Sequence, residues 1–181
     1  MTITVIRDIK NHRFTERESL LLDTNILLSV YGPNANKESY TYIYSDALAR
    51  MRSSKSTIFI DALVLSEFIN RFARWAFDQL PYETKPSEFK AYRKCDEFKK
   101  VAQEIADDTR RIIDYATWCD SEFGSIDMNK LLREYEIGDS DFNDQVIAHL
   151  CKKRGFTLVT HDGDFRSSEI DILTANRRLL K

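Results

Sequence analysis

The stretch Ser19–Ile26 constrains the fold of this chain more than any other segment. It reads Ser-Leu-Leu-Leu-Asp-Thr-Asn-Ile, so an apolar run ends at Asp23 and a polar pair follows at once. Such a run predicts a buried strand that ends in a polar turn and leads into a helix. Open α/β folds bind their ligands at the carboxyl ends of their strands, so we expect Asp23 to lie at a functional edge of a sheet.

Strand-like and helix-like segments alternate along the rest of the chain. After the strand at 20–23, short strands are predicted at 57–60, 156–160 and 171–174, with an edge strand within 1–18. Helices are predicted over 37–53, 62–80, 87–123 and 127–135, and from the acidic stretch 138–144 to about residue 154. This alternation indicates an α/β fold with a mainly parallel sheet. With 181 residues, the chain is expected to form a single domain, residues 1–181.

The segment 87–123 carries apolar residues three or four positions apart throughout. That spacing predicts an antiparallel helix pair or a coiled-coil seam, and it leaves open where the segment breaks. An apolar seam of this kind also makes a homodimer a reasonable hypothesis.

Composition narrows the classes of function. The net charge is −2, so attraction to nucleic acid would have to come from a local basic face. No apolar run approaches the ~20 residues of a membrane span, and the N-terminal residues lack a signal-peptide layout, so a cytoplasmic protein without a membrane partner is expected. The three cysteines lack Cys-x-x-Cys spacing and predict reduced thiols, with neither a disulfide framework nor a zinc site implied.

Acidic residues stand at four places where a parallel sheet would gather them. They are Asp23, Glu67, the pair Asp141/Asp144 and the pair Asp162/Asp164. Each of these acids also has a purely structural explanation. Asp23 fits a helix cap, and Glu67 fits an exposed ion pair with Arg71. The pair Asp141/Asp144 fits helix capping, and the pair Asp162/Asp164 fits a turn.

The four places taken together favour a metal site. Carboxylates a few ångströms apart raise one another's pKa unless a positive charge lies between them, and no Lys or Arg lies inside any of the four motifs. A hard divalent cation with oxygen ligands, Mg²⁺ or Mn²⁺, is the natural counter-charge. Such a site suits phosphodiester hydrolysis, which needs no protein nucleophile. The sequence contains no Ser-His-Asp signature and no P-loop.

Four motifs together resemble the PIN domain family. They are Leu21-Leu22-Asp23-Thr24-Asn25-Ile26-Leu27, Leu65-Ser66-Glu67-Phe68, Asp141-Phe142-Asn143-Asp144-Gln145-Val146-Ile147-Ala148 and Leu158-Val159-Thr160-His161-Asp162-Gly163-Asp164-Phe165. The resemblance implies a three-layer α/β/α fold and a Mg²⁺- or Mn²⁺-dependent nuclease that acts on RNA, with an endoribonuclease expected. Many members are toxins of bacterial toxin–antitoxin pairs, so an antitoxin protein is an expected partner beside the RNA substrate.

The resemblance also assigns the site residues. Asp23, Glu67, Asp144 and Asp162 match the catalytic acids; the metal-site acids include Asp141 and Asp164 as well, and whether Asp162 or Asp164 is the fourth acid stays open. Thr24, Asn25 and Thr160 match supporting polar residues, and Arg71 and Arg74 are candidates for holding the nucleic-acid backbone.

Two departures and two alternatives accompany this interpretation. The chain is longer than a compact toxin of the family, with a helical insertion predicted at about 81–135 and extra residues at the N-terminus. A phosphatase with Asp23 as nucleophile would usually have a second Asp two positions on, where this chain has Asn25. A non-catalytic PIN-fold scaffold that binds RNA or protein is the other alternative.

Overall fold

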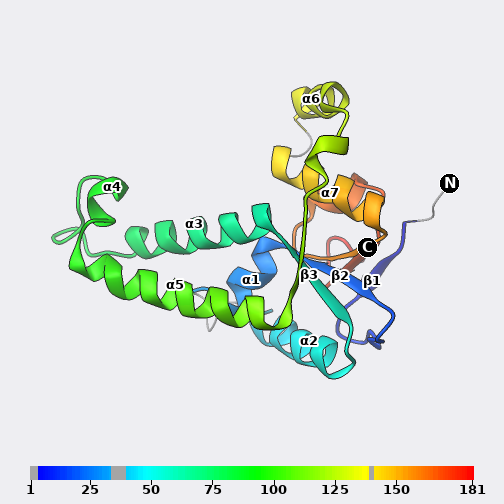
Figure 1. Cartoon of the computed structure of the whole chain (residues 1–181), viewed down its shortest axis with the longest axis horizontal. Coiled ribbons are helices and arrows are strands. Elements are labelled where there is room, and N and C mark those ends of the chain that lie inside the picture. Colours follow the sequence, from blue (N-terminus) through cyan, green and yellow to red (C-terminus); the bar gives the residue numbers. More distant parts are fainter. Residues whose placement is uncertain (1–3, 34–39, 139–140) are drawn as a thin grey trace.

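The chain forms a parallel sheet with helices on both faces (Figure 1). The computed structural model describes residues 4–33, 40–138 and 141–181. Six strands in these residues make one sheet in the order β1-β6-β5-β2-β3-β4. The strands are β1 (Ile6–Asp8), β2 (Ser19–Leu22), β3 (Thr57–Asp61), β4 (Thr117–Cys119), β5 (Thr157–Val159) and β6 (Ile172–Thr174). Every neighbouring pair is parallel, which confirms the predicted α/β/α class.

The strand order reverses at the centre of the sheet. From β2 the chain continues through β3 to β4 on one side, whereas β5 and β6 lie on the other side. Leu20, Leu21 and Leu22 of β2 are almost fully buried, because helices cover both faces of this central strand. The point between β2 and β5 is therefore the topological switch point, where open parallel sheets bind ligands beyond their carboxyl ends.

The helices fall largely where the sequence predicts them. They are α1 (Thr24–Tyr31), α2 (Thr41–Ser53), α3 (Ala62–Asp78), α4 (Phe89–Tyr92), α5 (Asp96–Tyr115), α6 (Met128–Ile137) and α7 (Phe142–Arg154), with short 3₁₀ turns η1 (Phe123–Ser125) and η2 (Asp164–Ser167). Asp61 caps α3 by accepting a hydrogen bond from the Leu63 N–H. The start of the helix predicted at 37–53 and part of the stretch 138–144 lie outside the described residues.

The prediction of helix throughout 87–123 is wrong in two places. The helix is interrupted at 93–95, between α4 and α5, and it ends at Tyr115. Residues 117–119 then form β4, which pairs with β3 through the register Phe59↔Thr117. Three residues are too few to show a strand alternation, and Ala116 and Cys119 pack on the core from positions that also fit a helical spacing. The antiparallel partner of α5 is α3, and the two helices form an arm (Figure 1).

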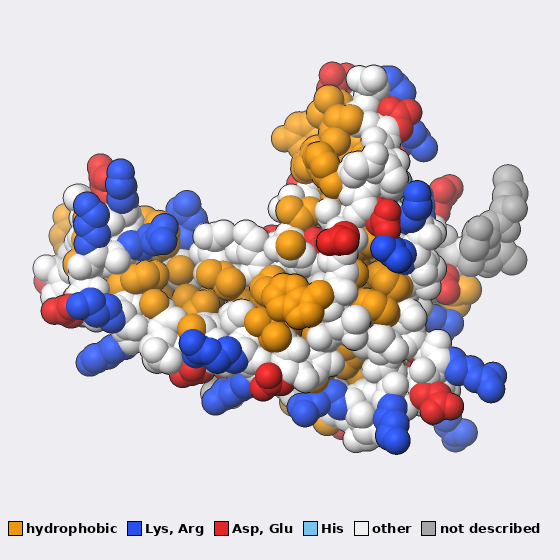
Figure 2. All heavy atoms as spheres, viewed as in Figure 1, with side chains coloured by type: hydrophobic (Ala, Val, Ile, Leu, Met, Phe, Trp, Pro, Cys, Tyr) orange, Lys and Arg blue, Asp and Glu red, His pale blue; other side chains and the backbone are white. Residues whose placement is uncertain are grey.

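Apolar side chains gather along this arm and on α6 (Figure 2). The exposed large apolar residues on these elements and on β4 are Ile69, Trp118, Leu132, Tyr135 and Ile137. Within residues 4–33, 40–138 and 141–181, no helix is both long and apolar enough to cross a bilayer.

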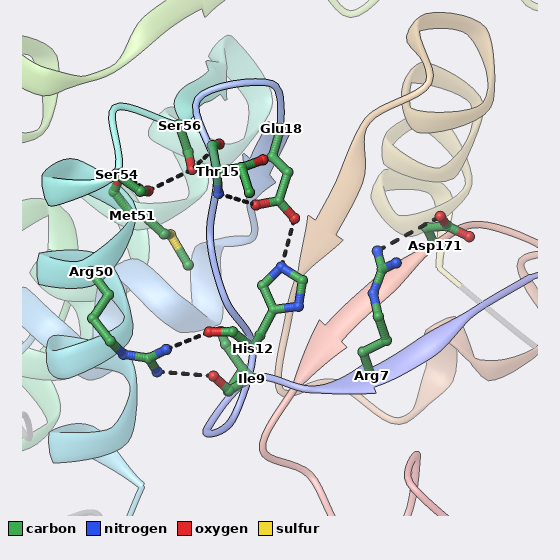
Figure 3. Close-up of polar contacts among 10 residues, drawn as sticks. All are labelled: Arg7, Ile9, His12, Thr15, Glu18, Arg50, Met51, Ser54, Ser56 and Asp171. Atoms are coloured by element: carbon green, nitrogen blue, oxygen red, sulfur yellow. Dashed lines mark hydrogen bonds and ion pairs between the residues drawn. The ribbon is translucent and has the colours of Figure 1, made fainter.

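Arg50 of α2 fastens the segment that connects β1 to β2 (Figure 3). Its guanidinium donates to the carbonyls of His12 at 2.8 Å and Ile9 at 2.9 Å. Within the same segment, Glu18 accepts from the Thr15 N–H at 2.7 Å and contacts His12 Nε2 at 2.6 Å. These contacts set the path by which the chain enters the central strand.

We expect Arg50→Ala to lower the free energy of unfolding by about 1–3 kcal/mol, because two partly buried carbonyls lose charge-assisted hydrogen bonds. Urea denaturation followed by circular dichroism measures the change. Arg13→Ala, which removes an exposed arginine from the same segment, is the matched control and should change stability by less than about 0.5 kcal/mol. Equal stabilities of the two variants would contradict the role assigned to Arg50.

Candidate functional site at the sheet switch point

Asp23 occupies the helix-cap position of α1, yet its carboxylate makes no capping hydrogen bond. Its Oδ2 atom instead accepts from Thr160 Oγ1 at 2.6 Å and from Asn25 Nδ2 at 2.5 Å. The side chain is only 6% exposed. Capping therefore does not explain this buried carboxylate, and residues from both sides of the switch point hold it in place.

Asn25 and Thr160 connect the turn after β2 to the turn after β5. Asn25 Nδ2 also lies 3.1 Å from Thr160 Oγ1, and Asn25 Oδ1 accepts from the His161 N–H at 3.0 Å. Thr160 Oγ1 further accepts from the Asp162 N–H at 2.9 Å. These bonds leave Asp23 a single orientation and order the loop that carries the next acids.

Glu67 approaches from α3. Its Oε2 atom accepts from Thr24 Oγ1 at 3.3 Å, and its Oε1 atom forms an ion pair with Arg71 Nη1 at 3.1 Å. The exposed pair expected from the sequence is thus present. The Glu67 charge also raises the pKa of Asp23, so the carboxylate faces the site as well as Arg71.

Asp141 and Asp144 lie at the start of α7. Asp141 caps this helix, because its Oδ1 atom accepts from the Asp144 N–H at 2.8 Å. Burial raises the pKa of Asp144 to about 7, and the carboxylates of four further acids add to that shift. They are Asp141, Asp23, Asp162 and Asp164. The charges of Asp23 and of the turn after β5 therefore act on Asp144 together with that of Asp141.

Asp162 and Asp164 occupy the turn after β5, and a turn is the structural role that the sequence predicts for them. Asp162 Oδ1 accepts from the Asp164 N–H at 3.0 Å, and Asp164 begins η2. The charge of Asp162 raises the pKa of both Asp23 and Asp144, and the charge of Asp164 raises that of Asp144.

Burial is the main reason for the raised pKa values of Asp23 and Asp144. It raises the pKa of Asp23 to about 6 even though hydrogen bonds from Thr160 and Thr24 lower that pKa, and Glu67 and Asp162 raise it further. In the part of the chain that the structure describes, no three His, Cys, Asp or Glu side chains stand as a ready-made metal site. Several carboxylate oxygens are engaged as caps or in the ion pair, so chelation would require side-chain rotation.

The two arginines proposed from the sequence lie in different places. Arg71 contacts Glu67 at the site. The guanidinium of Arg74 instead lies 4.8 Å from the centre of the Phe89 ring, on the side of the arm. Of these two arginines, Arg71 is the one that lies beside the acids.

Sequence reasoning missed the aromatic surroundings of the site. Tyr44 contacts His161 Nδ1 at 2.8 Å, and Tyr40 stacks on the His161 ring with centroids 4.0 Å apart. Trp75 lies one helical turn after Arg71 and lines a cavity with it. The helical spacing of these residues is equally typical of a core face, so the sequence carries no signal that separates the two roles.

Comparisons with known proteins place the chain in a family. Residues 20–169 match the family model of the PIN domain. No curated protein matches the sequence. Among solved structures, one described as VapBC2 from Rickettsia felis bound to a DNA fragment from their promoter is similar, with 18% sequence identity and a TM-score of 0.49. The similarity covers 86% of this chain and 98% of that chain.

Proposed function

Because the chain belongs to the PIN domain family, we propose that it is a metal-dependent ribonuclease that hydrolyses phosphodiester bonds within RNA. The observation that supports this proposal most is the convergence on Asp144. The charges of four other acids, from the turn after β2, the start of α7 and the turn after β5, all raise the pKa of this half-buried carboxylate. A purely structural cluster of this kind would destabilise the fold without a cation to neutralise it.

The donor atoms fit Mg²⁺ or Mn²⁺, because all of them are carboxylate oxygens. We propose Asp23, Glu67, Asp144 and Asp162 as the residues that would hold the cation and support catalysis, with Asp141 and Asp164 beside them. When bound, such a cation supplies Lewis-acid stabilisation of the phosphoryl oxygens and lowers the pKa of an attacking water.

Other residues of the chain would position these acids. Thr160 and Asn25 hold the carboxylate of Asp23, and Thr24 holds that of Glu67. Arg71 is more than half exposed and lies beside Glu67, so its guanidinium can bind a phosphate of the incoming RNA while it remains near the acids.

The activity test uses purified protein and a single-stranded RNA, with Mn²⁺ or with EDTA. We expect internal cleavage that depends on Mn²⁺. Calorimetry with Mn²⁺ separates the alternatives, because a non-catalytic scaffold would bind RNA or protein without binding the ion. Absence of both Mn²⁺ binding and cleavage would contradict the proposed function.

We also propose a toxin role with an antitoxin protein as partner, which rests on family membership. The exposed apolar residues of the arm and α6 support a protein partner, since patches of this kind mark interaction surfaces (Figure 2). Induced expression in a bacterial host should arrest growth for the wild type and not for Asp144→Asn. The alternative is that this surface binds a second copy of the chain. Gel filtration of the purified chain tests for such a homodimer.

A further inference from the structure

A small cavity opens beside the acids, between α1, the beginning of α2 and α3. Its volume is about 220 Å³. Its walls are Asn25, Leu28, Ser29, Gly32, Pro33, Tyr40, Arg71 and Trp75. Two of these residues also belong to the acid site: Asn25 donates to the Asp23 carboxylate, and Arg71 pairs with Glu67. The cavity therefore shares a wall with the place where a phosphodiester would be cut.

The walls suit a flat, partly apolar ligand. Tyr40 and Trp75 provide aromatic rings, and Leu28 and Pro33 provide apolar surface. Contacts behind Tyr40 hold its ring, since it stacks on His161, whose Nδ1 atom lies 2.8 Å from the Tyr44 hydroxyl. Rigid aromatic surfaces of this kind bind nucleic-acid bases by stacking, with little sequence preference.

Gly32, in the wall of the cavity, lets the chain turn closely against the end of α1. A Cβ atom at this position would lie 2.3 Å from the Leu28 carbonyl oxygen, which is too close for any other residue without movement of the backbone. Gly32 donates its N–H to that same oxygen at 2.8 Å, so the turn after α1 is drawn tightly against the helix.

The size of the cavity limits the ligand to one base. Its volume of about 220 Å³ is smaller than the ~300–1,000 Å³ of pockets that enclose a drug-sized molecule. A base inside a duplex is paired and stacked, and it would first have to be extruded at a cost of a few kcal/mol. A base of a single strand carries much less of this cost.

We propose that this stacking cavity holds one unpaired base of the RNA next to the scissile phosphate, with Trp75 and Tyr40 as its base-binding residues. The substrate class is then single-stranded RNA or an unpaired loop. Arg71, at the rim, binds the phosphate that connects the held base to the acid site. The inference rests on the proposed function, and it adds a specificity-determining contact to it.

The chain contains two tryptophans, Trp75 and Trp118, so each can be made the single fluorescent reporter. Trp118→Phe retains only Trp75 in the cavity, and Trp75→Phe retains only Trp118, which is 56% exposed on β4. In EDTA, where no turnover occurs, titration with a short unpaired RNA should quench Trp75 saturably and leave Trp118 unchanged. The same RNA made fully abasic should not quench Trp75. Quenching of both tryptophans alike, or of neither, would overturn the proposal.

Kinetics with Mn²⁺ provide the second readout. Trp75→Ala should lower kcat/KM for single-stranded RNA roughly 5- to 100-fold, the range expected for the loss of one stacked base. Trp75→Phe should retain most activity, and Trp118→Ala should stay within about twofold of the wild type. Thermal unfolding followed by circular dichroism shows whether Trp75→Ala folds, so that loss of the stacked base is separated from loss of the fold.

The two readouts separate the failure of this inference from the failure of the proposed function. A wild-type protein that cleaves RNA with Mn²⁺ while Trp75→Ala cleaves it equally well refutes the stacking cavity and leaves the nuclease standing. Saturable quenching of Trp75 in a protein that cleaves nothing supports base binding and contradicts the nuclease.

Discussion

Asp144→Asn is expected to lower Mn²⁺-dependent RNA cleavage by at least ~100-fold. The change keeps the shape of the side chain but removes the charge that faces Asp23, Asp141, Asp162 and Asp164. A bound divalent cation contributes several kcal/mol to a phosphodiester transition state, and each 1.36 kcal/mol is a factor of ten in rate. Loss of a central carboxylate should remove a large part of that stabilisation. The measurement is kcat/KM on a single-stranded RNA at fixed Mn²⁺.

Asp114→Asn is the matched control, because Asp114 is an exposed aspartate on α5 and the substitution is chemically the same. It should leave kcat/KM within about twofold of the wild type. Mn²⁺ titration by calorimetry should show weaker binding for Asp144→Asn than for Asp114→Asn. Equal cleavage by Asp144→Asn and the wild type, with the metal present, would remove the proposed mechanism.

The position of the acids could be predicted from the sequence because parallel strands end at the same edge of a sheet. The leucine run before Asp23 and the apolar run before Thr160 predict buried strands, and both form where expected. Which strands lie side by side depends on the topology of the whole sheet and not on the sequence of each strand. The sequence therefore indicated which acids could meet, but it could not show that β5 lies directly beside β2.

Long-range hydrogen bonds explain what the sequence could not show. Asp23 stands where a helix cap is expected, but Asn25 and Thr160, the latter 137 positions away, direct its carboxylate elsewhere. β4 escaped prediction for a different reason, since a three-residue edge strand is specified by the β3 backbone that it pairs with. The stacking cavity combines residues of α1, of α3 and of the segment before α2, and the helical spacing of Leu28 and Trp75 also fits a core pattern.

The metal-free protein should lose stability as the pH rises from about 4 to 8. Burial raises the pKa of Asp23 to about 6 and that of Asp144 to about 7, whereas an unfolded aspartate titrates near 3.9. Between these values the folded state binds more protons than the unfolded state, so the free energy of unfolding decreases with rising pH. For Asp23 alone, a shift of this size corresponds to roughly 3 kcal/mol at 1.36 kcal/mol per pKa unit.

Asp144→Asn should restore most of the stability that the ionisation of Asp144 removes at high pH. In EDTA near pH 8, urea denaturation should find the variant more stable than the wild type by about 1–3 kcal/mol, because the buried like charge is gone. Near pH 3, where Asp144 is protonated in both the folded and the unfolded wild type, the two should agree within about 0.5 kcal/mol. A variant less stable than the wild type at pH 8 would mean that Asp144 supports the fold. A variant that gains stability and loses cleavage would instead show that Asp144 supports cation binding and cleavage and lowers the stability of the fold.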